Sequence, residues 1–144
     1  MVVKACEKDI NEIVKMALKV FEGSKEEELI EEFNDLFMKE DFVVFLKKDN
    51  DNIIGFAQCQ LRHDYVEGCD YSPVCYLEGI YIEEEYRLKG YAKELLDYCS
   101  QWGKQHNCKE FASDCEINNY ISYMFHIKCG FSEMNRVICF KKKL

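Results

Sequence analysis

Apolar residues recur every three or four positions in four stretches of the chain, a spacing that predicts one buried face on each of four helices. The clearest stretch is residues 89–105, where Leu95, Leu96, Cys99 and Trp102 fall on one face. The other predicted helices are residues 8–21, residues 24–38, which open on a Ser24-x-x-Glu27 capping box, and residues 119–129, which end at Gly130.

Shorter apolar runs between polar segments predict strands. Strands at residues 42–46 and 53–62 flank the polar segment 48–52, which predicts a hairpin. An apolar strand at residues 74–82 follows the only proline. Further strands are expected at residues 1–6, 110–115, 131–134 and 136–142. This mixed order, without a linker or a repeat, predicts one α/β (α+β) domain over residues 1–144.

Composition narrows the classes of partner. The 144 residues include 19 basic and 27 acidic side chains, and the net charge of −8 argues against nucleic acid or an anionic membrane as a partner. Because no apolar run could span a bilayer and the N-terminus lacks a signal pattern, we expect a cytoplasmic protein. The cysteine count is odd and no C-x-x-C pair occurs, so we expect neither a metal site nor a disulfide framework. Five cysteines in apolar segments are expected in the core: Cys6, Cys59, Cys75, Cys99 and Cys139.

Acidic residues are concentrated between Glu22 and Asp41, where nine carboxylates accompany only Lys25 and Lys39. Such a stretch is typical of a solvated helix face. It is also compatible with a rim that concentrates a cationic substrate near a cleft.

The segment Arg87-Leu88-Lys89-Gly90-Tyr91-Ala92 lies where a predicted strand gives way to a predicted helix. Gly90 and the small Ala92 let the backbone approach a ligand, and a helix N-terminus offers free N–H groups. The segment therefore predicts an anion site suited to a phosphate or pyrophosphate. Neither a P-loop nor a G-x-G-x-x-G turn is present.

Together with Asn119-x-x-Ser122-x-x-x-His126-x-x-x-Gly130-Phe131, this R-x-x-G-x-A turn resembles the acetyl-CoA site of the GNAT N-acetyltransferase superfamily. Other motifs are similar to those of the aminoglycoside 6′-N-acetyltransferases: Tyr65-Val66-x-Gly68, Ser72-Pro73-Val74-x-x-Leu77-Glu78-Gly79-Ile80-Tyr81, Phe111-Ala112-Ser113-Asp114 and Arg136-Val137-x-x-Phe140-x-Lys142. The resemblance implies the GNAT fold, a mixed, mostly antiparallel central sheet of about six to seven strands flanked by about four helices.

The resemblance also implies acetyl-CoA as the cosubstrate. Backbone groups would hold its pyrophosphate at Leu88, Lys89, Gly90, Tyr91, Ala92 and Lys93, and its pantetheine arm at Ile80, Tyr81 and Ile82. One N–H of the second set would polarise the acetyl carbonyl. Asn119 would bind the arm or the substrate, although Asn is equally suited to capping a helix.

Glu78, Asp114 and His126 are the candidate catalytic residues. A carboxylate without a partner in an apolar strand destabilises the fold. One interpretation is that Glu78 pairs with an arginine or points to the solvated face of the sheet. The other is that it faces the substrate cleft, where it holds the substrate ammonium or takes its proton. Asp114, at the end of the neighbouring strand, has the same alternatives, and the residues are compatible with either carboxylate as the base. His126 is either a packing residue or the group that protonates the leaving thiolate, directly or by relay.

Candidate substrate contacts follow from the same resemblance. Tyr65 matches a position that contacts the antibiotic, and the alternative is an exposed loop aromatic. Glu78 and Asp114 together would suit a polycationic aminosugar. Phe21 and Ser24 stand where relatives often carry Trp and His, and Asn135 stands where some carry an acidic residue. These departures imply a narrower or shifted substrate range.

The implied reaction is transfer of an acetyl group from acetyl-CoA to the 6′-amine of an aminoglycoside, by direct attack of the amine on the thioester, with antibiotic resistance as the result. Two alternatives remain: a GNAT enzyme that acts on a polyamine, a peptide or another small amine, and a CoA-binding module without catalysis. The resemblance also implies a homodimer formed through C-terminal strands, for which residues 137–140 are sufficiently apolar. The following lysines are equally compatible with a solubilising tail.

Overall fold

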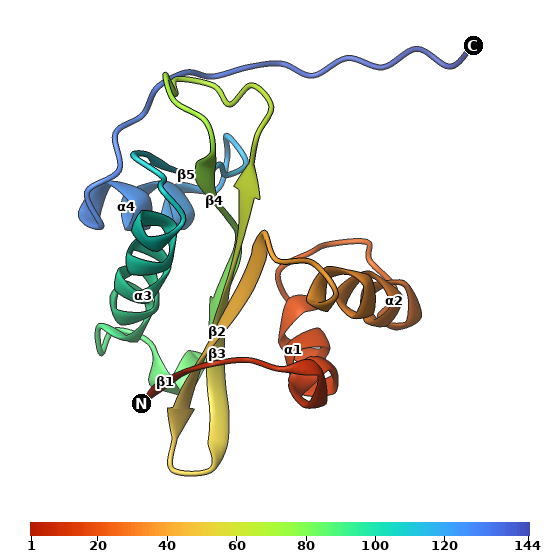
Figure 1. The fold of residues 1–144 in the computed structure, drawn as a ribbon, viewed down its shortest axis with the longest axis vertical. Helices are drawn as coiled ribbons and strands as arrows, with labels where there is room; N and C mark the ends of the chain where they lie inside the picture. The colour runs from red at the N-terminus through yellow and green to blue at the C-terminus, as the bar shows by residue number, and fades with distance from the viewer.

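The computed structural model describes residues 1–144 and contains a five-stranded sheet with helices on both faces (Figure 1). The strands are β1 (Val2–Lys4), β2 (Phe42–Asp49), β3 (Asn52–Arg62), β4 (Val74–Ile82) and β5 (Phe111–Ala112). The helices are α1 (Ile10–Ala17), α2 (Glu26–Phe37), α3 (Tyr91–Gln105) and α4 (Tyr120–Lys128), with short 3-10 turns η1 (Glu7–Asp9) and η2 (Glu84–Tyr86).

The strands lie in the order β1-β2-β3-β4-β5. The first four are antiparallel, and β5 pairs with β4 in parallel. The mixed, mostly antiparallel sheet and the four flanking helices are confirmed, but the expected count of six to seven strands is wrong.

The C-terminal segment accounts for this difference. Residues 131–134 and 136–142, both expected as strands, form no regular structure, and the end of the chain runs away from the sheet (Figure 1). An apolar segment becomes a strand only where a neighbouring strand offers its backbone groups, and this segment meets no such neighbour within its own chain.

Successive side chains along each strand point to opposite faces of the sheet, so the core forms two layers, one on each face. In β3, Ala57 and Cys59 pack in the cluster that covers α3, whereas Phe56 packs in the cluster beneath α1 and α2. The predicted apolar face of α3 is buried. Of the cysteines expected in the core, Cys59, Cys75 and Cys99 are buried, whereas Cys6 and Cys139 are exposed and contradict the prediction.

Several predicted boundaries shift. The first helix ends at Ala17, so residues 18–25 form a connection that leads to α2. The predicted capping box does not form, because Lys25 rather than Ser24 is the N-cap residue of α2. β5 is reduced to two residues because β4 and β5 pair only at Cys75 with Phe111 and at Tyr76 with Ala112. No helix combines the length and apolar character that a membrane span requires.

Candidate active site

One edge of β4 is open over more than half of its length. β3 pairs with β4 along the whole strand, but β5 pairs only with Cys75 and Tyr76. From Leu77 to Ile82, which includes the predicted contacts Ile80, Tyr81 and Ile82, β4 has no second neighbouring strand. Such an edge can bind an extended ligand through backbone hydrogen bonds.

The turn after β4 presents free backbone donors near this edge. Leu88 and Gly90 both have positive φ, at 62° and 81°. Gly90 is the N-cap residue of α3 and has no side-chain cap, so the first N–H groups of that helix, at Tyr91, Ala92 and Lys93, have no partner within it. Arg87 ties the turn to β4, because its Nε donates to the carbonyl oxygen of Ile82 at 2.8 Å.

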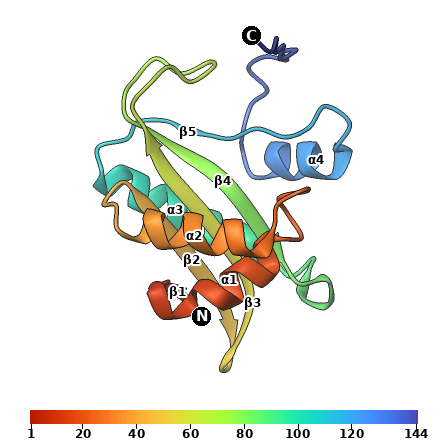
Figure 2. The ribbon, with the colours of Figure 1, turned by 90° about the vertical axis from the view of Figure 1, so that its right-hand side faces the viewer.

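This turn has the features of an anion site. A Cβ atom built on Gly90 would meet no atom within 4 Å, so the space beside the free N–H groups is open. Free N–H groups at a helix N-terminus favour an anion, and the dipole of α3 adds to the attraction. In Figure 2, this turn and α4 lie on the same side of β4.

Asn119 is placed at the start of α4. Its Oδ1 accepts a hydrogen bond from the Ser122 backbone N–H at 3.1 Å, which is the capping geometry. The structure therefore shows the capping role that the sequence offered as one of two alternatives, and Asn119 keeps its amide NH₂ group free for a ligand.

Glu78 lies in a β-bulge of β4. Gln58 of β3 pairs with Gly79 and its neighbour Cys59 pairs with Leu77, so Glu78 is the extra residue between them. A bulge interrupts the ladder and re-aims a side chain, which is a common device beside active sites. The side chain of Glu78 remains 21% exposed.

Arg62, at the end of β3, is the partner of Glu78. Its Nε and Nη2 donate to the two carboxylate oxygens at 3.0 and 2.9 Å, a bidentate pair. The guanidinium also lies 3.4 Å from the centre of the Tyr76 ring. Burial, the largest single influence, lowers the pKa of the Arg62 guanidinium, but its hydrogen bonds to Glu78 and the attraction of nearby acidic groups together outweigh this effect, so the pKa is raised. The arginine pairing weighed for Glu78 is thus present in this structure.

Tyr76 connects this pair to the second predicted carboxylate. Its hydroxyl donates to Oδ2 of Asp114, which follows β5. Burial and this hydrogen bond raise the pKa of Tyr76 well above its ordinary value, so Tyr76 remains a protonated donor. The two carboxylates, expected to converge on one amine, therefore belong to one network that runs from Glu78 through Arg62 and Tyr76 to Asp114.

His126 occupies a defined position on α4. Its Nδ1 lies 2.6 Å from the carbonyl oxygen of Ser122, and its Nε2 lies 2.8 Å from the hydroxyl of Ser113. Because a carbonyl oxygen only accepts, Nδ1 must carry a proton. In a neutral ring, Nε2 therefore accepts a hydrogen bond from the hydroxyl of Ser113. Ser113 is thus the polar neighbour of Nε2.

Two predicted substrate contacts, Phe21 and Ser24, come from the connection between α1 and α2. They line a cavity of about 150 Å³ together with Leu29, Glu32, Phe33 and Gln58. The ring of Phe21 packs over β4, since a Cβ atom on Gly79 would lie 2.8 Å from its Cζ. Within the acidic stretch, Glu32 borders this cavity, and all the carboxylates on α2, Glu32 included, are exposed to solvent.

The other two predicted substrate contacts meet through a residue that the sequence did not indicate. Glu67 accepts from the hydroxyl of Tyr65 at 2.9 Å and from the side-chain amide of Asn135 at 2.7 Å. The hydrogen bonds from Asn135 and Tyr65 lower the pKa of Glu67. Residues 65 and 135 thus lie together although 70 positions separate them in the sequence.

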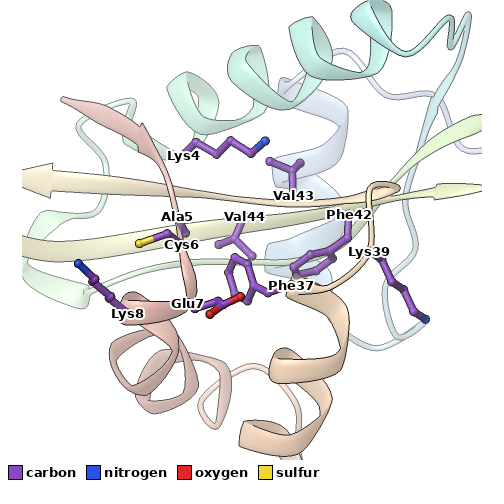
Figure 3. A pocket seen from close by; sticks show the side chains of 10 residues that line it. All are labelled: Lys4, Ala5, Cys6, Glu7, Lys8, Phe37, Lys39, Phe42, Val43 and Val44. Atoms are coloured by element: carbon purple, nitrogen blue, oxygen red, sulfur yellow. The ribbon is translucent and has the colours of Figure 1, made fainter.

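A larger cavity of about 410 Å³ lies elsewhere, where β1 ends beside β2 and α2 (Figure 3). Its floor is apolar, with Phe37, Phe42 and Val44, and it contains none of the predicted site residues. The candidate site is therefore identified by its chemistry and not by the size of a cavity.

The sequence reading missed five residues that complete the site: Arg62, Tyr76, Ser113, Glu67 and Gln58. One signal was available for Arg62, because a buried carboxylate in a strand requires a cation on a neighbouring strand. The others are polar residues whose partners lie far away in the sequence, and no spacing rule indicates them.

Comparison with known proteins places this geometry in a family. Residues 10–131 match the family model described as Acetyltransferase (GNAT) family. The aminoglycoside N(6′)-acetyltransferase type 1 of Salmonella typhimurium is 47% identical over 90 residues, which make up 62% of this chain and 62% of that protein. The match therefore spans less than two thirds of that relative.

Longer matches extend over nearly the whole chain. The aminoglycoside N(6′)-acetyltransferase type 1 of Acinetobacter haemolyticus is 32% identical over 140 residues, 97% of this chain and 96% of the relative. The structure of AAC(6′)-Iy in complex with the bisubstrate analogue CoA-S-monomethyl-acetylneamine has 30% identity and a TM-score of 0.94, covering 100% of this chain and 98% of that one. The chain therefore belongs to the acetyltransferase (GNAT) family and, within it, to the aminoglycoside N(6′)-acetyltransferases, as the sequence motifs predicted.

Proposed function

We propose that this protein is an acetyl-CoA-dependent aminoglycoside 6′-N-acetyltransferase that confers resistance to its substrates. The observation that carries the proposal is the position of the bulged Glu78 at the open edge of β4, so that a carboxylate and a site for an extended ligand meet on one strand. The names of the relatives and the bisubstrate complex of AAC(6′)-Iy support this reading.

On the donor side, we assign the pyrophosphate to the backbone of residues 88–93 and the pantetheine arm to the open edge at Ile80, Tyr81 and Ile82. The acetyl thioester supplies the activated acyl group. An N–H on the open edge stabilises the oxyanion that forms when the amine attacks. Fixing the amine and the carbonyl carbon in contact supplies a large part of the rate.

On the acceptor side, Glu78 and Asp114 bind ammonium groups of the aminosugar, and one of them takes the proton that the attacking amine must lose. Glu78 is the stronger candidate for this base, because the bulge places it on the same strand as the donor site. An incoming ammonium competes with Arg62 for the carboxylate of Glu78. Asp114 is held in place by the hydroxyl of Tyr76. Tyr65, in the loop after β3, and Asn135, in the segment after α4, contact the substrate. Phe21 provides an apolar wall for a sugar ring.

The leaving thiolate requires a proton, and we assign its delivery to His126 acting through Ser113. The hydroxyl of Ser113 can give its proton to sulfur only if it receives one from the ring of His126, which must then be an imidazolium. His126→Gln and Ser113→Ala should therefore each lower kcat, and both should remove the alkaline limb of the pH–rate profile, which a required general acid produces. A role confined to packing would change stability without this shared pH dependence.

The test is turnover with acetyl-CoA and a panel of amines. Product mass is measured alongside free thiol, because the exposed Cys6, Cys115 and Cys139 also react with thiol reagents. Turnover confined to 6′-amino aminoglycosides supports the proposal, and expression in a susceptible bacterium should then raise the inhibitory concentration. Turnover confined to polyamines or peptides contradicts it in favour of another GNAT enzyme, and CoA binding without turnover contradicts it in favour of a binding module.

The substrate range is tested separately. Phe21 and Ser24 shape the acceptor side differently from the Trp and His expected in relatives, so we propose a narrower or shifted range. Thermal-shift titration with kanamycin-type and gentamicin-type compounds should give unequal midpoints, and equal binding of both sets contradicts this proposal.

We further propose that the protein acts as a homodimer in the cytoplasm. The C-terminal side chains Val137, Ile138 and Phe140 are 67%, 81% and 91% exposed, which is unfavourable for an apolar segment in water. A second copy that pairs with this segment would cover them. Sedimentation analysis should give a dimer for the full chain and a monomer for a chain that ends at Arg136; a monomeric full chain contradicts the proposal. Nine free thiols suit a reducing compartment.

A further inference from the structure

One charged side chain is buried in the core layer beneath α3. Lys47, near the end of β2, is only 6% exposed, and no other charged residue of the chain is buried to this degree. Val43 and Phe45 of the same strand belong to the cluster that covers α3, so alternation along β2 directs Lys47 to that face as well. A buried charge destabilises the fold unless it has a partner, so the contacts of Lys47 indicate its role.

The ammonium of Lys47 contacts the first turn of α3. Its Nζ donates to Oε2 of Glu94 at 2.6 Å and lies 4.4 Å from the centre of the Tyr91 ring. Tyr91 is the first residue of α3, and Glu94 is the acidic residue of its first turn. The same turn carries the free N–H groups to which we assign the pyrophosphate. Lys47 therefore lies beneath the donor site and is connected to it by two side chains.

Lys47 is charged in this position. Burial, the largest single influence, lowers the pKa of its ammonium, but its hydrogen bonds, chiefly to Glu94, and the attraction of nearby acidic groups together outweigh this effect, so the pKa is raised. The side chain of Glu94 is 40% exposed, and Glu94 forms no other ion pair. The positive charge of Lys47 is therefore the one that compensates the carboxylate of Glu94.

This compensation is important because the ligand expected at the turn is an anion. A carboxylate without a partner in the first turn would repel a pyrophosphate and would compete with it for the positive end of the α3 dipole. A cation beneath the turn removes this repulsion and leaves the space beside the N–H groups open. The contact with the ring of Tyr91 also fixes the conformation of the turn.

We propose that Lys47 is a positioning residue for the donor, whose ammonium neutralises Glu94 and fixes the first turn of α3 so that this turn accepts the pyrophosphate of acetyl-CoA. Lys47 acts through Glu94 and Tyr91 and does not touch the ligand. The inference rests on the proposed function, because it assumes that the pyrophosphate binds at residues 88–93. It adds a residue of β2, outside the donor site, that makes the turn favourable for an anion.

The two partners of this ion pair should have different effects on donor binding. Lys47→Met leaves the carboxylate of Glu94 uncompensated, so the Kd for acetyl-CoA in calorimetry should rise about fivefold or more. Glu94→Gln leaves the cation uncompensated, so the Kd should fall or stay within about twofold of the wild type. The double variant has neither charge and should also bind within about twofold of the wild type. The matched control is Lys48→Met, which removes the next lysine of β2, a residue without an ion pair to Glu94, and should leave the Kd unchanged.

Stability separates this role from a purely structural one. Both single variants break the same partly buried pair, so both should lower the thermal midpoint. A purely structural role would weaken acetyl-CoA binding in both variants in step with the midpoint, and this result overturns the inference. An unchanged Kd in Lys47→Met, or a double variant that binds as weakly as Lys47→Met, also overturns it. If Lys47→Met does not fold, Glu94→Gln decides: a raised Kd contradicts the inference, and an equal or lower Kd with a lowered midpoint supports it.

A shortened donor shows whether the pyrophosphate carries the effect. S-Acetylpantetheine lacks the pyrophosphate, so Lys47→Met should bind it as the wild type does, and an equal loss for both donors overturns the inference. If the variants bind acetyl-CoA in the expected pattern but the wild type acetylates no aminoglycoside, the proposed function fails and the role of Lys47 stands. If the wild type acetylates aminoglycosides and Lys47→Met binds acetyl-CoA as the wild type does, the role of Lys47 fails alone.

Discussion

The donor and acceptor sides of the candidate site are built in different ways. The donor side is one continuous unit, the open edge of β4 followed by the turn at Leu88–Gly90 and the start of α3, and it offers backbone groups. The acceptor side consists of side chains from β3, β4, the residues after β5 and the connection between α1 and α2. The donor side therefore depends on local conformation, and the acceptor side depends on pairing between distant segments.

The largest expected effect tests whether the two sides are separable. Glu78→Gln keeps the shape and the hydrogen-bond acceptor for Arg62 but removes the charge and the base. Loss of a general base commonly costs about 10²- to 10⁴-fold, so kcat/KM for the acceptor should fall within that range. The affinity for acetyl-CoA, measured by calorimetry, should change by less than about twofold because donor binding uses the backbone. Exposed Glu85→Gln serves as the control, and a comparable loss of acetyl-CoA affinity in Glu78→Gln would contradict the separation.

The sequence predicted most of the elements because each depends on nearby residues. The apolar spacing of α3 and the hairpin of β2 and β3 are confirmed for this reason. The C-terminal strands were wrong, since Val137 and Phe140 have the composition of a strand but no neighbour to pair with in this chain. The capping box at Ser24 was wrong because α2 starts after Lys25.

The same distinction applies to the site. Gly90 could be identified because positive φ next to a helix N-terminus is a property of one short segment. Glu78 and Asp114 could be named, but their partners Arg62 and Tyr76 could not, because these pairs form only when the sheet assembles.

Arg62 provides the next sharpest test of the acceptor side. Arg62→Met removes the cation that faces Glu78 and leaves a partly buried carboxylate without its partner. The free energy of unfolding should fall by about 1–3 kcal/mol, measured by urea denaturation. The acceptor should bind more tightly in calorimetry, because its ammonium no longer competes with the guanidinium. The control is Arg136→Met, which breaks an exposed pair with Glu133 and should change the free energy of unfolding by less than about 1 kcal/mol. Weaker acceptor binding in Arg62→Met would contradict the prediction, because Arg62 would then support acceptor binding instead of competing with the ammonium for Glu78.

Two glycines allow the two sides to be perturbed by the same chemical change. Gly90 and Gly23 have φ of 81° and 77°, and a Cβ atom on either would meet nothing within 4 Å. Alanine at either position therefore disturbs only the backbone, at a cost of about 1–2 kcal/mol for the left-handed conformation. Gly90→Ala should raise KM for acetyl-CoA about 5- to 30-fold, and Gly23→Ala, in the connection that carries Phe21, should raise KM for the acceptor instead. If each variant raised both KM values equally, the two sides would share one conformational equilibrium.

Tyr76 gives the smallest effect, and it is confined to alkaline pH. Because its pKa is raised by burial and by its bond to Asp114, the folded chain keeps the phenolic proton above pH 10 while the unfolded chain releases it. The contribution of Tyr76 to stability is therefore complete below about pH 10 and declines above it, by about 1.4 kcal/mol for each pH unit. Tyr76→Phe removes this decline, so the difference in the free energy of unfolding between wild type and variant should shrink from pH 9.5 to pH 11. Exposed Tyr71→Phe is the control for general alkaline unfolding and should show no such change. If the difference in the free energy of unfolding between wild type and Tyr76→Phe stayed constant over this pH range, the pKa of Tyr76 would not be raised and Asp114 would be held by other contacts.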